Sequence, residues 1–563
     1  MSPSSGIIFR SKLSASFTNS SIATYRTTAT RYASRFRGAP KTHTQGPLTT
    51  VSNPTQDNKQ CEHTAPKLLD QTTPVPADRN PFIFSRGHWL SHDSARQAAR
   101  RIRFDFSKLC KRVVACCAGA KSVVSWSKQD NLIYRTLVFH TDSGKCVVVR
   151  LPTPAAGLAG RAVNSEVATI RYLTSKTDIP VPSILEWTED NDNTVGHTYL
   201  MMEHATGVSL HDVWSNLRGN WEKKCVKAIC RQLTKTTQLC FPAYGSLYLS
   251  DTSSVPSSCK IQMGNNFCIG PQCGPIEQDL YARQAFIPGS GPWASMPEFA
   301  NGVVCLGLEG VANRHRISVP DRPYQGTPEQ HVDLLNHAHR LLMSVVEDSR
   351  VHPDSIHTML HANPTMRNVF VDPRDPRIVT CITGWQACTI SPAFSYRHVG
   401  RLRIPPFDAG EDVNDTFPQQ GEISSIRKSW LYSLFLNCHN TWYQGLPGLE
   451  KCLIECAQNW HYFHLPGLCP YEPPTFELAD ERYRRWSNDR TIKREVCHLL
   501  GNVKDDFVEN DAWSDMPEKL KKARISLYKS ACEAGEACEE YGLVFHGDTR
   551  ETIDASWPYS DFD

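Results

Sequence analysis

The sequence predicts a bilobal α+β fold: a small lobe built on an antiparallel sheet, and a larger, mainly helical lobe with a helical C-terminal extension. Two patterns support this fold class. Before residue 208, short runs rich in β-branched and aromatic residues alternate with turn signals, which is typical of strands. After residue 210, apolar residues recur at three- and four-residue steps, which is typical of packed helices. With 563 residues, the chain can bury a large core.

The small lobe is predicted at 79–208. Apolar spacing within 91–117 predicts an amphipathic helix or a helix pair that packs on the sheet. Three strands, a helix and a further strand should follow, and Asn164 has a residue type preferred at a helix N-cap. The expected strands are 123–126, 133–140, 146–151 and 198–203, and the expected helix is 164–174.

The larger lobe is predicted at 209–400, with helical stretches at 210–239 and 328–346. Between them, 250–325 is rich in Gly, Pro and Ser and is expected to form a functional lid or a loosely ordered loop. The extension at 401–563 should be helical, with a loose, mildly acidic tail from Asp548. Its candidate helices are 428–443, 449–463, 475–486 and 518–537.

The first 56 residues contain no Asp or Glu, and they carry several Arg and Lys among many Ser and Thr. This composition is typical of a mitochondrial transit peptide, so we expect residues 1–56 to direct the chain to the mitochondrion, with the matrix as its destination. A disordered basic tail would have the same composition. Residues 57–78 lack periodicity and are expected to form a flexible lead-in.

Charge and cysteine content exclude several classes. A net charge of +3 gives no overall electrostatic reason to expect binding to nucleic acid or to an anionic membrane. No apolar run approaches the roughly 18 residues of a transmembrane segment. The 21 cysteines are scattered, without the spacing of a disulfide framework. Cys259, Cys268 and Cys273 lie close in sequence but lack the paired spacing of a zinc site.

The most informative motif begins at His361. A phosphotransfer loop of the kinase type has the pattern His-x-Asp-x-x-x-x-Asn, in which Asp orients the attacking hydroxyl and Asn holds Mg²⁺. Here His361 and Asn368 keep that spacing, but Asn363 stands in place of the Asp. Two short strands, 369–371 and 378–382, flank a turn, and the residue that follows them at the metal-binding position is Gly384.

These residues resemble the aminoglycoside phosphotransferase superfamily, which has a protein-kinase-like fold, and more closely the fungal mitochondrial family named altered inheritance of mitochondria protein 9. The metal strand of that family ends Ile-Asp-Trp-Gln, which is matched here by Thr-Gly-Trp-Gln at 383–386. Further stretches match in order from about residue 80 to about residue 400. Among them are FSRGHWL at 84–90, VVVRLP at 147–152, SEVAT at 165–169, IPVP at 179–182, LMME at 200–203 and GPW at 291–293.

The resemblance implies ATP and Mg²⁺ as cofactors and assigns roles to particular residues. It implies that Arg150 is the strand cation that contacts the phosphates and that Glu166 is its helical partner. Met202 and Glu203 would lie at the hinge that meets the adenine edge. In this family the loop histidine, here His361, commonly supports the loop backbone, so a buried structural role is expected for it.

Both carboxylates that phosphotransfer needs are missing. An amide at 363 cannot accept a proton, and losing a general base costs about 10²- to 10⁴-fold in rate. Gly384 offers no metal ligand, and Mg²⁺ is normally held by one or two carboxylates. The turn at 127–134 also lacks the usual glycine, and Asp130 would place negative charge near the phosphates.

These losses favour a mitochondrial pseudokinase, a kinase-like fold that binds an unidentified protein or small-molecule partner. An active small-molecule phosphotransferase remains the alternative, with Asp372 or Asp375 supplying a displaced carboxylate. A third possibility is a structural or assembly element that binds no ligand.

Overall fold

The described residues all belong to one compact unit of the chain, Gln60–Asp563. The predicted transit peptide at 1–56 lies outside the described part, as does most of the lead-in. A computed structural model describes residues 63–64, 80–217, 220–273, 290–314, 322, 324–347, 355–395, 425–463, 465, 467–473, 476–501, 503, 506–533, 553–554 and 557–559.

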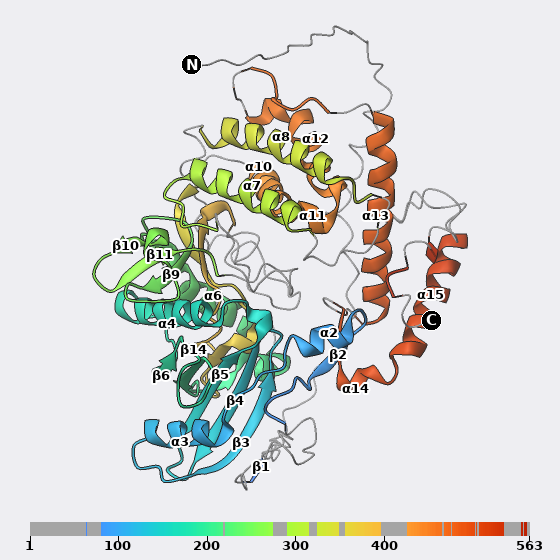
Figure 1. The fold of residues 1–563 in the computed structure, drawn as a ribbon. Helices are drawn as coiled ribbons and strands as arrows, with labels where there is room; N and C mark the ends of the chain where they lie inside the picture. The colour runs from blue at the N-terminus through green and yellow to red at the C-terminus, as the bar shows by residue number, and fades with distance from the viewer. Residues whose placement is uncertain are drawn as a thin grey trace. The chain divides into compact units, whose positions relative to one another are not determined.

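The small lobe is an antiparallel sheet of six strands in the order β1-β3-β4-β5-β7-β6 (Figure 1). The predicted order of three strands, a helix and a further strand is present, because helix α4 (Ala159–Lys176) follows β5, and β6 and β7 come next. The α+β class is therefore confirmed. The strands are β1 (His63–Thr64), β3 (Val123–Asp130), β4 (Tyr134–Thr141), β5 (Cys146–Pro152), β6 (Ile184–Thr188) and β7 (Tyr199–Glu203).

Alternation along these strands separates two faces of the sheet. One face buries Leu137, Phe139 and Val149 against helix α3 (Phe106–Cys116). Together with α2 (Asp93–Ala98), this helix forms the predicted helix pair. On the other face, Arg150 of β5 forms an ion pair with Glu166 of α4. The strand pattern therefore directs the side chain of Arg150 toward α4.

The prediction of Asn164 as a helix N-cap is wrong. Helix α4 begins at Ala159, and Asn164 is fully buried within it. Its side chain joins the loop after β6 to the end of the strand Ser246–Leu249: Nδ2 donates to Glu189 Oε2 at 2.9 Å, and Oδ1 accepts from Leu249 N–H at 3.0 Å. An Asn that satisfies its amide through tertiary partners has the same sequence signature as an Asn that caps a helix.

Three small sheets belong to the second lobe. One has the order β10-β11-β9, one has the order β14-β13-β8, and the third pairs β12 with β15. The helices α5 (Leu210–Val213) and α6 (Asn220–Thr234) occupy part of the predicted stretch 210–239. The strand bounds are β8 (Val208–Ser209), β9 (Ser246–Leu249), β10 (Ile261–Met263), β11 (Phe267–Gly270), β12 (His357–Leu360), β13 (Val369–Val371), β14 (Val379–Ile382) and β15 (Thr389–Pro392).

The expectation of a lid or a loose loop at 250–325 is wrong for its described part. That part contains β10, β11 and a 17-residue helix, α7 (Met296–Ala312). Helix α7 is central to the helical core and packs on α8 (Pro328–Val346) and α10 (Ser425–His439). A Cβ added at Gly307 would lie 2.3 Å from the carbonyl oxygen of Cys438, so a glycine allows α7 to approach α10 closely.

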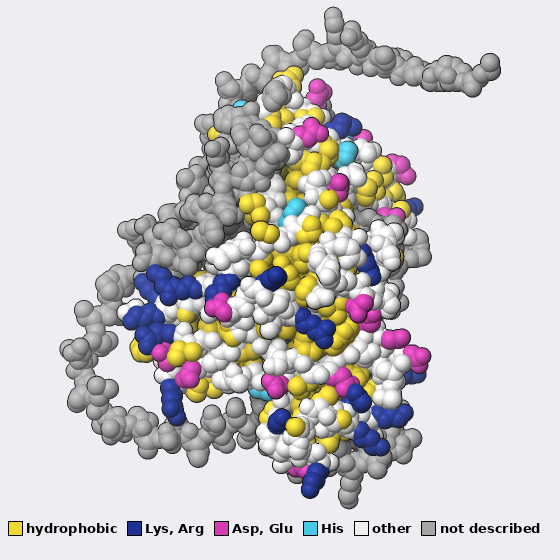
Figure 2. Space-filling model, turned by 90° about the vertical axis from the view of Figure 1, so that its left-hand side faces the viewer, with side chains coloured by type: hydrophobic (Ala, Val, Ile, Leu, Met, Phe, Trp, Pro, Cys, Tyr) yellow, Lys and Arg dark blue, Asp and Glu magenta, His cyan; other side chains and the backbone are white. Residues whose placement is uncertain are grey.

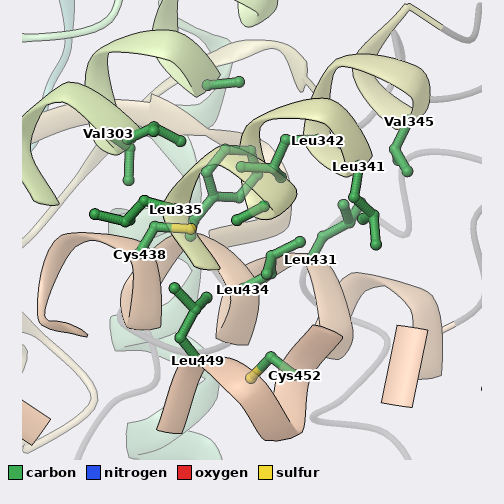
Figure 3. Packing of buried hydrophobic residues seen from close by; sticks show 14 of the residues in the cluster. Val303, Leu335, Leu341, Leu342, Val345, Leu431, Leu434, Cys438, Leu449 and Cys452 are labelled. Carbon is green, nitrogen blue, oxygen red and sulfur yellow. The ribbon is translucent and has the colours of Figure 1, made fainter. Parts of the chain in front are cut away.

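The helical core is apolar and continuous across four helices. Leu335, Leu342, Leu434 and Leu449 from α8, α10 and α12 (Leu446–Gln458) point into it together with Val303 of α7 (Figure 3). The short helix α11 (Thr441–Gln444) joins α10 to α12. Helices that begin beyond residue 401 therefore share one core with α7 and α8.

The C-terminal extension returns to the start of the described chain. Strand β16 (Phe507–Glu509) pairs with β2 (Gly87–Trp89), and α14 (Asn510–Trp513) contacts both strands. Helices α13 (Phe476–Leu499) and α15 (Met516–Glu533) contact each other. The expectation of a loose tail is wrong at Tyr559, which is 2% exposed and donates its hydroxyl to Asp506.

The surface carries both signs of charge. Figure 2 shows Lys and Arg side chains gathered at one edge of the visible face, while hydrophobic side chains are exposed over its middle. In the part of the chain that the structure describes, no helix combines the length and the hydropathy that crossing a membrane requires.

Candidate functional site

The predicted loop and the predicted metal strand meet in space. Val369 pairs with Ile382 in the β13–β14 hairpin, so Asn368 and Thr383 face each other just beyond it. The Thr383 N–H donates to the Asn368 carbonyl at 2.8 Å. The hairpin register therefore brings the end of the loop against the segment that contains Gly384.

His361 supports the loop from within. Its Nε2 donates to the Thr383 carbonyl at 2.9 Å, and its Nδ1 accepts from the Asn363 N–H at 3.2 Å. Burial lowers the pKa of His361 to about 4, so the ring is neutral at physiological pH. The ring meets Trp385 edge-on with 4.5 Å between centroids, and Trp385 is fully buried beneath the loop. Both groups are placed to hold the backbone.

Asn368 closes the loop on itself. Its Nδ2 donates to the Asn363 carbonyl at 2.8 Å, and Thr383 Oγ1 lies 3.5 Å from its Oδ1. In contrast, the Asn363 side chain is half-buried, and no residue in the described part of the chain bonds its amide. The predicted metal ligand is therefore held by the loop backbone, whereas the residue at the catalytic position is held only through its main chain.

Gly384 has a backbone conformation that other residues rarely adopt, with φ at +85°. A Cβ at this position would lie 2.7 Å from Nδ2 and 2.8 Å from Cγ of Asn368. The Asn368 amide thus occupies the space that a side chain at 384 would enter. An aspartate cannot be placed here unless Asn368 releases Asn363 and moves.

This donor set does not fit Mg²⁺. The loop and the strand offer the side-chain amide oxygens of Asn363 and Asn368, and Gly384 offers no ligand. Mg²⁺ prefers octahedral oxygen coordination that includes at least one carboxylate. Among the described residues, no group of three or more His, Cys, Asp and Glu side chains could hold a metal ion.

The Arg150–Glu166 pair is formed and buried. Arg150 Nη1 donates to Glu166 Oε1, and the two side chains are 9% and 1% exposed. Burial raises the pKa of Glu166, and Arg150 opposes that rise. The guanidinium also lies over the Tyr134 ring at 4.5 Å. These contacts hold β5 to α4, and they present one cation where the resemblance implies phosphate.

Met202 and Glu203 lie at the end of β7, as predicted. Met202 is buried in the core and pairs with Val148, whereas Glu203 is exposed. The Glu203 N–H already donates to Ser183 O at 2.9 Å, and the His204 N–H donates to Cys146 O at 3.2 Å. Both hinge N–H groups therefore already donate hydrogen bonds to main-chain carbonyls of the protein.

The expected effect of Asp130 near the phosphates is wrong, because its charge is buried and compensated. Asp130 Oδ1 lies 2.5 Å from Arg135 Nε, and Oδ2 lies 3.6 Å from Lys128 Nζ. Asp130 Oδ2 also accepts from the Ser85 N–H at 2.8 Å. These bonds join the turn between β3 and β4 to the segment before β2. The negative charge of Asp130 is therefore balanced by neighbouring cations.

The two candidate replacement carboxylates lie at the far end of the hairpin. Asp372 and Asp375 are in the turn, and the three residues of β13 lie between Asn368 and Asp372, which puts those two residues roughly 13 Å apart along the strand. Asp372 Oδ1 accepts from the N–H groups of Arg374 and Asp375. The guanidinium of Arg377 donates two hydrogen bonds to Asp375 and its main-chain N–H donates a third, and together they lower the pKa of Asp375 to about 2. Both carboxylates stabilise the turn.

Sequence reasoning missed the residues that close the site. Arg135 lies in an apolar strand, and a buried cation there could have signalled a buried carboxylate partner. The bond between Asn368 and Asn363 has no sequence signal, because it depends on the conformation of the loop. A glycine close to the end of a strand can indicate a positive φ. The sequence therefore offered a signal that the backbone at Gly384 has an unusual conformation, in addition to lacking a carboxylate.

Comparisons with known proteins give sequence relatives and structural neighbours. No family model matches the chain. In structure, the ADP-bound aminoglycoside phosphotransferase APH(2'')-Ib aligns with 68% of this chain and 95% of its own, at 8% identity and a TM-score of 0.31. The GDP and kanamycin complex of APH(2")-IIIa aligns with 67% and 97%, at 13% identity and a TM-score of 0.33.

Sequence relatives are fungal. A subtelomeric hrmA-associated cluster protein of Aspergillus fumigatus is 26% identical over 295 residues, which are 46% of this chain and 56% of that protein. Altered inheritance of mitochondria protein 9 of Yarrowia lipolytica is 22% identical, over 51% and 53% of the two chains. The Candida tropicalis protein of the same name is 24% identical, over 48% and 51%. The chain matches about half the length of these curated relatives. These sequence relatives confirm the predicted resemblance to altered inheritance of mitochondria protein 9.

Proposed function

We propose that this chain is a mitochondrial kinase-like protein that has lost phosphotransfer and acts as a pseudokinase, binding a protein or small-molecule partner. The observation that carries the proposal is the pairing of Gly384 with Asn368. The amide of Asn368 fills the space above Gly384 and bonds to the loop carbonyl of Asn363. At the position of the second metal ligand there is therefore no side chain, and the amide of Asn368 occupies the space.

The residues that remain at the site can bind a ligand but lack the groups for phosphotransfer. Arg150 keeps a cation in place, and it could contact a phosphate through a bidentate fork. Without a carboxylate at 363 or 384, neither the acceptor hydroxyl nor a metal ion is positioned for transfer. We infer that any nucleotide binds independently of Mg²⁺.

The test is thermal unfolding of the full chain with ATP, with and without Mg²⁺, together with an assay of ATP turnover. Nucleotide at 100 times its Kd adds about 2.7 kcal/mol of stability, which is readily detected. A shift that needs no metal, without turnover, supports the proposal. Robust Mg²⁺-dependent turnover by the wild-type protein would overturn it, and no shift with any nucleotide would direct the search to protein partners.

A matched variant tests whether the two missing carboxylates are the cause. Asn363→Asp/Gly384→Asp restores both residue types of the kinase loop. If the Asn368 contact is what excludes a ligand at 384, this double variant should be destabilised in the absence of metal, and Mg²⁺ with ATP should recover part of the loss. The single variant Asn363→Asp, which makes no contact with Asn368 through its side chain, is the control.

The second candidate function is an active small-molecule phosphotransferase that uses a displaced carboxylate. It predicts that Asp372→Ala or Asp375→Ala abolishes turnover while the fold is kept. Their place in the turn, roughly 13 Å along the strand from Asn368, and their existing partners favour the pseudokinase.

We also propose that the protein acts in the mitochondrion. The absence of Asp and Glu from residues 1–56 supports import, and the relatives of Yarrowia lipolytica and Candida tropicalis are named as mitochondrial. Residues 1–56 fused to a fluorescent protein should carry it into mitochondria, and protection from added protease after outer-membrane rupture would place it in the matrix. A fusion that stays in the cytosol would contradict this part of the proposal.

A further inference from the structure

A basic surface with exposed apolar residues is formed by α6 and the turn between β13 and β14. We call it the α6–hairpin surface; it comprises residues 221–231 and 372–378. Cys225 Sγ donates to the Pro376 carbonyl at 3.1 Å, and the Arg377 guanidinium lies 5.0 Å from the centre of the Trp221 ring. These contacts join the two elements into one surface.

Charge on this surface is strongly one-sided. The surface contains six basic and three acidic side chains, an excess that equals the net charge of +3 of the whole chain. Two of the three acids are already held: Asp375 is bound by Arg377, and Asp372 caps the turn. The basic residues are Lys223, Lys224, Lys227, Arg231, Arg374 and Arg377.

Three of these six cations have no ion-pair partner in the part of the chain that the structure describes. Across the described residues, no carboxylate forms an ion pair with Lys224, Lys227 or Arg374, and all three are exposed. The apolar face of α6 packs into the core, where Ile229 and Leu233 are buried. Any partner of α6 therefore meets its charged face.

Two large apolar side chains accompany the charges. Trp221 is 46% exposed, and it is the one tryptophan among the exposed large hydrophobic side chains of the described residues. Ile378 is 54% exposed. Exposing such side chains beside lysines brings no advantage in water, whereas a bilayer interface favours both: tryptophan at the headgroup level and cations against anionic lipid.

We propose that the α6–hairpin surface docks on a membrane that contains anionic phospholipids. Lys224, Lys227 and Arg374 would contact the headgroups, and Trp221 and Ile378 would enter the interface between headgroups and acyl chains. Docking of this kind is peripheral and reversible, and it is weakened by salt. It does not depend on whether the candidate nucleotide site binds a ligand.

The test is co-sedimentation of the full chain with phosphatidylcholine vesicles that either contain or lack phosphatidylglycerol. Neutralising two basic residues in Lys224→Gln/Lys227→Gln should lower the partition coefficient on anionic vesicles about 20- to 30-fold. The control variant Lys519→Gln/Lys521→Gln removes the same charge from exposed residues of α15 and should change it less than about twofold. The basic residues 1–56 are present in every variant and contribute equally.

Trp221→Ala should weaken binding further at high salt, where the electrostatic part is screened. Equal binding by the α6 and α15 variants would overturn the proposal, as would binding to polyglutamate or single-stranded RNA without binding to vesicles. Unchanged melting temperatures verify that the exposed substitutions leave the fold intact. Should the α6 variant fail to fold, Arg374→Gln probes the same surface from the hairpin.

Discussion

Gly384 and Asn368 are best understood as a pair. The backbone at 384 has φ of +85°, and the amide of Asn368 lies where the first carbon of a side chain would be. In the left-handed region a glycine avoids the clash between Cβ and the following carbonyl, a cost of about 1–2 kcal/mol for other residues. Two separate penalties therefore oppose a side chain at 384: backbone strain and crowding.

Alanine at 384 should separate these penalties when it is compared with alanine at Gly119. Gly119 has nearly the same φ, +84°, but open space around its Cβ position. We expect Gly119→Ala to lower the free energy of unfolding by about 1 kcal/mol and Gly384→Ala by about 1–3 kcal/mol more. Denaturant titration measures both values.

Adding Asn368→Ala to Gly384→Ala should remove the crowding and leave the strain. The double variant should therefore cost less than the two single variants together. If alanine lowered the free energy of unfolding equally at 119 and 384, Asn368 would move aside at no cost. The closed loop would then not prevent a side-chain ligand at 384.

His361 should make the fold sensitive to acid. Its pKa lies near 4, below the ordinary value of 6.5, so the unfolded chain binds more protons than the folded one between these values. The free energy of unfolding should therefore fall as the pH is lowered from 6.5 to 4, by about 3 kcal/mol for this group. His361→Gln should show a shallower dependence over that window in urea titrations at several pH values. A slope identical to that of the wild type would contradict the burial of a neutral ring.

At the residue scale, the sequence was informative about identity and spacing but less so about bonding. The spacing of His361, Asn363 and Asn368 located the loop, because a fixed backbone path imposes fixed intervals on its ligands. The closing bond from Asn368 to Asn363 could not be predicted, because either an open or a closed loop satisfies that spacing. Asp130 was misjudged because its partner Arg135 follows the turn inside an apolar strand, where a buried cation is not expected.

At the scale of elements, Arg150 and Glu166 join β5 to α4. Removing one partner of a buried pair leaves an uncompensated charge, which typically costs 3–5 kcal/mol. We expect Arg150→Met to lower the free energy of unfolding by about that amount, and Arg150→Met/Glu166→Leu to recover most of it. The two variants can be compared by thermal and urea unfolding.

The matched control is Arg112→Met. Arg112 pairs with Glu186 at a side-chain exposure of 45%, and exposed pairs contribute less than about 1 kcal/mol. If Arg150→Met cost no more than Arg112→Met, the buried pair would have no structural role, and its retention would point to phosphate binding alone.

Elements with clear periodicity were predicted well. Strands β4 and β5 and helix α8 match the expected ranges closely, because alternation or a wide apolar stripe marks them. Helix α7 was missed because it is apolar on nearly all sides and lies between segments rich in Gly, Pro and Ser. A helix buried all round shows no amphipathic period.

At the scale of the whole described chain, the C-terminal extension is tied to the entry of the small lobe. Asp506 accepts from the hydroxyl of Tyr559 at 2.7 Å and from Lys493 Nζ at 3.1 Å. The Leu90 N–H donates to the Asp506 carbonyl at 2.9 Å. Burial opposes ionisation of Asp506, but these donors outweigh it, and its pKa lies below the ordinary value. Through its carboxylate and its main-chain carbonyl, the buried Asp506 thus links the segment after β2, α13 and the tail.

Removing the hydroxyl in Tyr559→Phe should loosen this link without creating a cavity. The buried carboxylate loses one donor, which costs about 1–3 kcal/mol. Because β16 pairs with β2 beside Asp506, hydrogen exchange should accelerate at Trp89 and Phe507 more than in the β10-β11-β9 sheet. Exchange that rose equally in both sheets would indicate general destabilisation, and unchanged exchange at Trp89 would show that the tail does not hold β2. Faster exchange confined to β2 and β16 would establish the extension as a strap on the small lobe, because the segment before β2 also fastens the Asp130 turn through Ser85.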